Sequence, residues 1–162
     1  MAFRELVRKK QALPEEECIR ILKEEKRGVL AVLGDDAYPY AFPINQWYCE
    51  EDGRIYFHGG NVGHHIDAMR RHNKASFCIY DAGTPDGNPK HPWALNVKSV
   101  IVFGRLEEVT DHEKALYISR QLSYKFTSDE TYIEYEIQHD GHRVLVFSLR
   151  PEHISGKLVN EA

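Results

Sequence analysis

The chain has 162 residues, of which 42% are hydrophobic and 28% are charged, and this composition is typical of one globular domain spanning residues 1–162. Its net charge is −4 and it has no basic stripe or polybasic cluster, so we expect no binding to nucleic acid and none to an anionic membrane. No apolar run approaches the roughly 20 residues of a transmembrane helix, and the charged start does not resemble a signal peptide, which predicts a cytoplasmic protein.

The first half of the chain alternates helical and extended patterns. We expect a helix at 14–26, a strand at 28–34, an extended run at 38–50, a strand at 54–59, a helix from about 61 to 72 and a strand at 75–80. Glu51-Asp52-Gly53 is typical of a hairpin turn. Pro39 and Pro43 cannot donate to a ladder, so the run that contains them is predicted to be an edge strand or to carry a bulge.

The second half begins with a predicted loop at 81–92, which is rich in proline and glycine. It continues with a strand at 97–109, a helix from a capping box at Thr110–Glu113 to about 125, a helix at 128–138, and strands at 143–149 and 153–159. Strands outnumber helices and tight turns join most of them, which predicts a mainly β, antiparallel barrel with peripheral helices. No glycine-rich phosphate loop follows the first strand, which argues against a dinucleotide-binding α/β fold.

The densest polar and aromatic segment runs from His58 to His65, where a predicted strand enters a glycine-containing turn that opens a helix. The first N–H groups of a helix are free and carry partial positive charge, so they suit a phosphate. Glycines at 59, 60 and 63 allow close approach, and His64 and His65 could add hydrogen bonds. The spacing alone favours two exposed histidines on a surface helix.

His58 ends its strand on the face opposite Ile55 and Phe57. A histidine titrates near neutral pH, so His58 could donate or accept a proton at the edge of a ligand. The alternative is a packed or solvated histidine.

Metal ligands and disulfides are not expected. His58, His64, His65 and His72 are close in sequence, but no pair has the i, i+4 spacing with an intervening glutamate. The cysteines at 18, 49 and 78 are far apart and outside any C-x-x-C pattern, which favours ordinary free thiols.

At these residues the sequence resembles the FMN-binding split-barrel proteins related to pyridoxamine 5′-phosphate oxidase, and among them the nitroimidazole-resistance (Nim-like) branch. The matching segments, in chain order, are Phe3–Lys10, Gly28–Val32, Asp35–Asn45, Ile55–His58, Gly63-His64, Ile66–Arg71, Ser99–Gly104 and Ile154–Lys157. They cover nearly the whole chain. The resemblance implies a six-stranded antiparallel split β-barrel of Greek-key type, and a homodimer with two FMN sites at the subunit interface.

The resemblance also implies roles for individual residues. Pro43, Ile44, Asn45 and Gln46 would border the isoalloxazine ring, His58 and Gly59 would lie beside the flavin, Gly63, His64 and His65 would bind its phosphate, and Ser99 would approach from a barrel strand. His58 is the candidate catalytic residue. This chain has His65 where the family usually has Lys or Arg, so phosphate binding is expected to be weaker or more pH-dependent unless Arg70, Lys98 or another cation compensates.

The first hypothesis is therefore an FMN-dependent oxidoreductase that passes electrons from a nicotinamide or another donor to a small oxidised acceptor. The flavin carries the redox chemistry in such an enzyme, and the protein supplies position and a dry pocket. A second hypothesis is a carrier or sensor that holds flavin, or haem, without turnover. A third is a different cofactor, such as a deazaflavin or a B6 phosphate.

Overall fold

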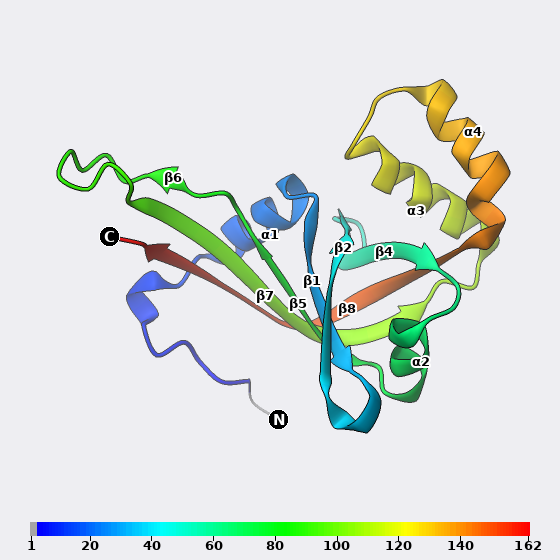
Figure 1. Cartoon of the computed structure of the whole chain (residues 1–162), viewed down its shortest axis with the longest axis horizontal. Helices are drawn as coiled ribbons and strands as arrows, with labels where there is room; N and C mark the ends of the chain where they lie inside the picture. Colours follow the sequence, from blue (N-terminus) through cyan, green and yellow to red (C-terminus); the bar gives the residue numbers. More distant parts are fainter. Residues whose placement is uncertain (1–2) are drawn as a thin grey trace.

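A computed structural model describes residues 3–162, and within this range the strands form one antiparallel sheet that curls into a half-barrel (Figure 1). The strand order is β2-β1-β5-β7-β8-β4-β3, and β6 pairs with β7 outside this path. The strands are β1 (Arg27–Leu33), β2 (Pro39–Asn45), β3 (Trp47–Cys49), β4 (Arg54–Gly60), β5 (Lys74–Tyr80), β6 (Thr84–Pro85), β7 (Leu95–Glu108) and β8 (Val144–Asn160). The helices are α1 (Glu15–Glu24), α2 (His64–Arg71), α3 (His112–Tyr124) and α4 (Glu130–Asp140), and short 3-10 turns lie at Lys9–Gln11, Asp35–Ala37 and Gly141–Arg143. The predicted mainly β, antiparallel split barrel with peripheral helices is confirmed.

The strand count differs from the expected six because two short strands, β3 and β6, join the sheet, which has eight strands between residues 3 and 162. The prediction of a structureless loop at 81–92 is wrong where β6 pairs with Leu95 and Asn96. The carboxylate of Asp81 explains this pairing, since its Oδ1 accepts hydrogen bonds from the backbone N–H groups of Gly83 and Lys98, both at 3.0 Å. The bend directs the chain back along β7.

The predicted extended run at 38–50 is divided into β2 and β3 at Gln46. The Gln46 side chain is fully buried, and its Nε2 donates to the carbonyl oxygens of Leu22 and Glu25 at the end of α1, both at 2.6 Å. The prediction that the proline-containing segment is an edge strand is confirmed, since β2 ends the strand order and, among the strands of residues 3–162, pairs with β1 alone.

The two strands predicted at 143–149 and 153–159 are one continuous strand, β8. A register shift opposite Phe103 and Gly104 absorbs one extra residue of β8 beside Pro151, and such a bulge is where a sheet tolerates proline. A Cβ at position 104 would lie 2.2 Å from the carbonyl oxygen of Arg150, so the two backbones can approach this closely only because Gly104 has no side chain.

The core has two parts, on opposite faces of β4. Ile55 and Phe57 point into the curl of the sheet and join the main cluster. Tyr56 points to the other face and packs with Ile118 and Leu122 of α3 in a second cluster. The predicted alternation along this strand is therefore confirmed, and it places His58 on the α3 side.

Two helix starts differ from the predictions. α2 begins at His64 rather than near 61, because Gly63 precedes it with a φ of 130°, a conformation that favours glycine. α3 is capped by Asp111 rather than Thr110, since the Asp111 carboxylate accepts from the N–H of Lys114 at 2.8 Å. No helix within the described part of the chain is long and apolar enough to span a membrane.

Candidate functional site

The first turn of α2 presents backbone donors that no other group in residues 3–162 uses. The N–H groups of His64 and His65 have no hydrogen-bond acceptor within this range. His64 stacks on Tyr40 with ring centroids 4.2 Å apart, and its Nε2 accepts from the N–H of Asp35 at 3.2 Å. The two histidines lie in the first turn of the helix, as the sequence indicates, and the free N–H groups form a donor pair that suits an anion.

His65 lies against the interior of the half-barrel. Its ring is tilted on Phe42 with centroids 5.1 Å apart, and a Cβ built on Gly59 would lie 3.7 Å from its Nε2. Burial, and to a lesser extent the charge of His64, lower the pKa of His65, so its ring is neutral at pH 7. His65 can therefore bind an anion as a hydrogen-bond donor, and it carries no fixed charge.

The two arginines of α2, and Lys98 on β7, are already paired. Arg70 donates to Glu108 at 2.6 Å, and Lys98 bonds Glu17 at 2.8 Å. Arg71 donates to Asp35 at 2.6 Å, so its guanidinium lies on a carboxylate next to His64. The two cations that the sequence offered as compensation, Arg70 and Lys98, are therefore held by their own carboxylates, and Arg71 belongs to the group around His64.

His58 lies on the opposite face of β4 from His65 and is paired in register with Val146 of β8. Its ring is half-buried and makes no hydrogen bond to residues 3–162, and burial lowers its pKa. A neutral ring has one donor and one acceptor nitrogen, and both are available here. In the described part of the chain, no group of three or more His, Cys, Asp or Glu side chains is placed to hold a metal ion.

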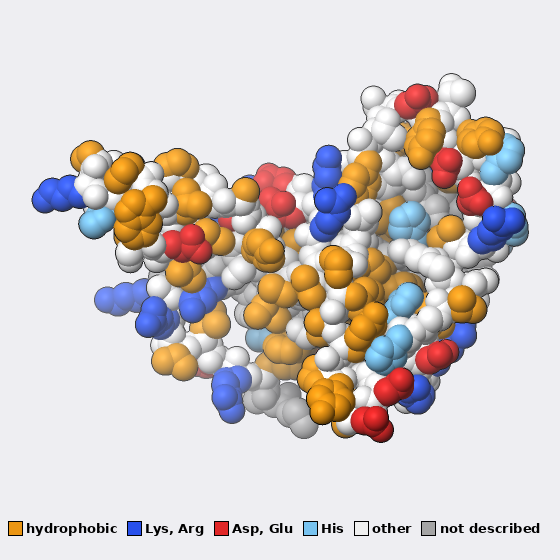
Figure 2. All heavy atoms as spheres, in the orientation of Figure 1, with side chains coloured by type: hydrophobic (Ala, Val, Ile, Leu, Met, Phe, Trp, Pro, Cys, Tyr) orange, Lys and Arg blue, Asp and Glu red, His pale blue; other side chains and the backbone are white. Residues whose placement is uncertain are grey.

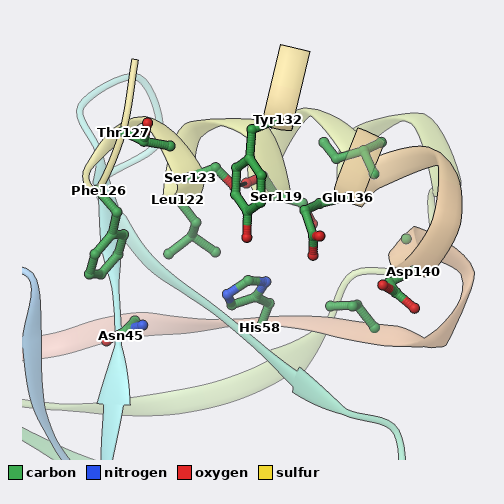
Figure 3. Close-up of a pocket in the computed structure, with 13 residues that line it drawn as sticks. Asn45, His58, Ser119, Leu122, Ser123, Phe126, Thr127, Tyr132, Glu136 and Asp140 are labelled. Carbon is green, nitrogen blue, oxygen red and sulfur yellow. Dashed lines mark hydrogen bonds between the residues drawn. The ribbon is translucent and has the colours of Figure 1, made fainter. Parts of the chain in front are cut away.

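A pocket of about 260 Å³ separates His58 from the α3–α4 helix pair (Figure 3). Apolar walls come from Leu122, Phe126, Ile137 and Val144, and polar groups come from Asn45, His58, Ser119, Ser123, Thr127, Tyr132, Glu136 and Asp140. The Tyr132 hydroxyl and the Glu136 carboxylate point from α4 toward the His58 ring (Figure 3). Such a concave site with few converging polar groups is typical of small-molecule binding.

The remaining predicted site residues are distributed around this pocket or away from it. Asn45 lines it with His58, and its Oδ1 accepts from Nε of Arg27 at 2.9 Å. Ile44 packs against the main core, and Pro43 lines a separate open cavity beside Tyr80. The amide of Gln46 is committed to α1, as described above.

Ser99 lies apart from both groups of histidines within the single chain. It is paired in register with Tyr80 of β5 and Lys157 of β8, and it does not line the His58 pocket.

Tyr132, Glu136 and Asp140 are pocket residues that sequence reasoning missed. They lie on α4, whose polar residues follow the pattern of any solvated helix. No motif marks them, because their position depends on how α3 and α4 fold back over β4.

Comparison with known families identifies the chain's relatives. A family model described as pyridoxamine 5′-phosphate oxidase matches residues 14–158. The chain belongs to the pyridoxamine 5′-phosphate oxidase-like family. This family assignment agrees with the curled antiparallel sheet, and it confirms the resemblance inferred from the sequence. No curated protein sequence matches the chain.

Solved structures with the same fold include three informative relatives. A candidate 5-nitroimidazole antibiotic resistance protein from Bacteroides thetaiotaomicron is 16% identical, with a TM-score of 0.74 over 92% of this chain and 87% of that one. An FAD-binding protein from Mesorhizobium loti is 23% identical, with a TM-score of 0.64 over 92% and 97%. The flavocytochrome Anf3 from Azotobacter vinelandii is 19% identical, with a TM-score of 0.69 over 96% and 72%. At these identities the likeness extends to the fold and not to the ligand.

Proposed function

We propose that this chain binds FMN and works as an oxidoreductase that passes electrons from a nicotinamide or another donor to a small oxidised acceptor. The observation that carries the proposal is the donor pair at the start of α2, next to glycines that leave room for a ligand. The family assignment and the flavin-binding relatives support it.

The residues around α2 fit a flavin phosphate. The N–H groups of His64 and His65 would bind it, and nothing lies closer than 3.7 Å to a Cβ built on Gly59 or Gly60. The site offers hydrogen bonds rather than an unpaired cation, since the guanidinium of Arg71 forms an ion pair with Asp35. Each hydrogen bond to a charged phosphate oxygen stabilises the complex by roughly 1.5–3 kcal/mol.

The ring would extend from α2 along the free edge of β2 toward Asn45. An edge strand has unpaired main-chain groups, which suit the polar edge of a heteroaromatic ring. Asn45 also lines the His58 pocket, so a ring held there would adjoin the site where an acceptor binds. The bound flavin would supply hydride or single-electron transfer.

His58 is the proposed catalytic residue, with the task of donating to or accepting from the acceptor. Its ring is half-buried, faces the pocket and has no competing hydrogen-bond partner in residues 3–162. The volume of about 260 Å³ lies below the roughly 300–1,000 Å³ of pockets for drug-sized ligands, which favours a small acceptor over a haem at this place.

The active form is proposed to be a homodimer. Several large apolar side chains on the outer face of the sheet are exposed, among them Tyr80 (59%), Ile101 (38%) and Phe103 (40%). Figure 2 shows hydrophobic side chains gathered over β1, β2, β5 and β7. Exposed apolar patches of this kind mark interaction surfaces. In a twofold dimer the patch of one copy would pack against the same patch of the other copy, so both would be buried.

The dimer is tested by placing a charge in that patch. We expect Ile101→Glu to give a monomer in analytical ultracentrifugation, because a buried unpaired carboxylate strongly disfavours association. Tyr135→Glu, at an exposed aromatic residue on α4, is the control and should leave the dimer intact. A wild-type monomer that holds FMN stoichiometrically would contradict the proposal.

The cofactor is tested by the visible spectrum of the purified protein. We expect the two flavin absorption bands, bleaching by NADH or NADPH, and recovery when an oxidised acceptor is added. Chromatography of the released ligand should give FMN rather than FAD, a deazaflavin or a B6 phosphate. A colourless protein that fails to bind added FMN would refute flavin binding, and flavin bands that no reductant bleaches would indicate a carrier or sensor.

A further inference from the structure

The His58 pocket has an uneven distribution of charge. Glu136 and Asp140 contribute carboxylates, and no Lys or Arg lines the pocket among residues 3–162. Asp140 lies 3.7 Å from Arg143, a largely exposed side chain outside the pocket. Glu136 lines the pocket and has no ion pair or hydrogen bond to any residue in the same range, so its carboxylate is available to a ligand.

Cations lie beyond the opposite end. Lys26 and Arg27 lie 5.3 and 5.8 Å from the centre of the Phe126 ring, and Arg27 also holds Asn45. Figure 3 shows Phe126 and Asn45 at one end of the pocket and Glu136 and Asp140 at the other. A ligand near His58 therefore meets a carboxylate on the α4 side, and the two cations stay outside.

The polar groups around the centre of the pocket lack partners. The Tyr132 hydroxyl, the Glu136 carboxylate and the His58 ring make no hydrogen bonds to one another or to other residues between 3 and 162, and all three are directed into one space (Figure 3). A carboxylate oxygen accepts hydrogen bonds, and no donor among residues 3–162 pairs with Glu136, so this side chain is available to a donor group of a ligand. An anion placed beside it would lose its hydration and meet a like charge, which excludes that ligand.

We propose that Glu136 makes this pocket selective for a small planar molecule that carries a cationic or N–H donor group, and that it excludes anionic analogues. Because the volume lies below that of pockets for drug-sized ligands, a single ring is the expected size. The inference rests on the proposed function in that it takes this pocket as the acceptor site. It also implies that a phosphate-bearing B6 compound is not the acceptor.

Three probes of equal shape and different charge test this selectivity: benzamidinium, benzamide and benzoate. Binding is followed through the NMR signals of the His58 ring protons, a measurement that does not depend on a bound flavin. We expect the wild-type protein to bind benzamidinium more tightly than benzamide, with no saturable binding of benzoate. Glu136→Gln should weaken benzamidinium binding by at least about tenfold, the effect of losing one charge-assisted hydrogen bond.

Glu113→Gln is the matched control, because it makes the same change of charge on α3 at an exposed residue outside the pocket. Its affinity for benzamidinium should equal that of the wild type. The inference is overturned if benzoate binds as tightly as benzamidinium, if Glu136→Gln changes nothing, or if none of the probes shifts the His58 signals. A flavoprotein that prefers benzoate overturns this inference alone, and a flavin-free protein that prefers benzamidinium overturns the proposed function alone.

Discussion

The two faces of β4 carry different parts of the candidate site. On the inner face, Phe57 lies in the main core and Gly59 faces His65, so this face combines stability with a place for an anion. On the outer face, Tyr56 anchors α3 and His58 faces a polar pocket. Neighbouring residues of β4 therefore contribute either to the core and the anion-binding turn or to the pocket. The eight residues from His58 to His65 connect the two faces around the end of the strand.

The largest expected difference between the faces is in stability. Phe57→Ala should lower the free energy of unfolding by about 3–5 kcal/mol, because it removes a fully buried ring from the main core. His58→Ala, one residue away, should cost less than about 1 kcal/mol, since the ring is only half-buried and has no partner to lose. Denaturant unfolding of both variants measures this, and equal losses would show that the outer face is also core.

The next effect concerns the anion site at α2. His64→Ala combined with His65→Ala should weaken FMN binding at least tenfold, because two hydrogen-bonding rings beside the phosphate are removed. His72→Ala, an exposed residue at the other end of α2, is the control and should leave binding unchanged. Fluorescence titration with FMN measures both, and unchanged affinity in the double variant would show that the two rings do not bind the phosphate.

The smallest effect is on acid stability. Burial lowers the pKa of His58 below the ordinary value of 6.5, so below this pH the unfolded chain binds more protons than the folded one. The free energy of unfolding therefore keeps its full value above pH 6.5, and it decreases as the pH falls from 6.5 through the pKa of His58 in the folded chain. We expect His58→Gln to reduce the loss of unfolding free energy between pH 7.5 and 5.

Carboxylates change the unfolding free energy at lower pH than His58 does, so they do not interfere with this measurement. Hydrogen bonds from Arg20 and Lys98 lower the pKa of Glu17 from 4.5 to about 2, so its contribution is lost only as the pH falls below 4.5. If the unfolding free energy of His58→Gln depends on pH as that of the wild type does between pH 7.5 and 5, then burial on the outer face of β4 does not lower the pKa of His58.

Most of the fold could be predicted from the sequence because local residue patterns determine most of its helices and strands. The alternation along β4, the prolines of β2 and the helix periodicity were each sufficient for a correct assignment. It failed where a distant partner decides the outcome, as at Gln46, whose amide binds the end of α1, and at Pro151, which is tolerated through a bulge opposite Gly104.

The candidate site was less predictable than the fold. The pattern around His58 and His65 indicated polar chemistry, and the helix start at His64 follows from the glycine before it. Glu136 and Tyr132 could not be found, because their positions depend on the packing of α4 across the outer face of β4. Which charge lies opposite a histidine is a property of the packed structure and not of local sequence.

The prolines of β2 have a consequence for assembly. The sheet has one terminal strand in which Pro39 and Pro43 lack N–H donors, and the other, β3, has only three residues. These two borders therefore disfavour strand addition by another chain, which is the usual aggregation risk of an open sheet with exposed apolar residues. A chain of this kind can therefore present an apolar face to a second copy and stop at a closed pair, without forming fibrils.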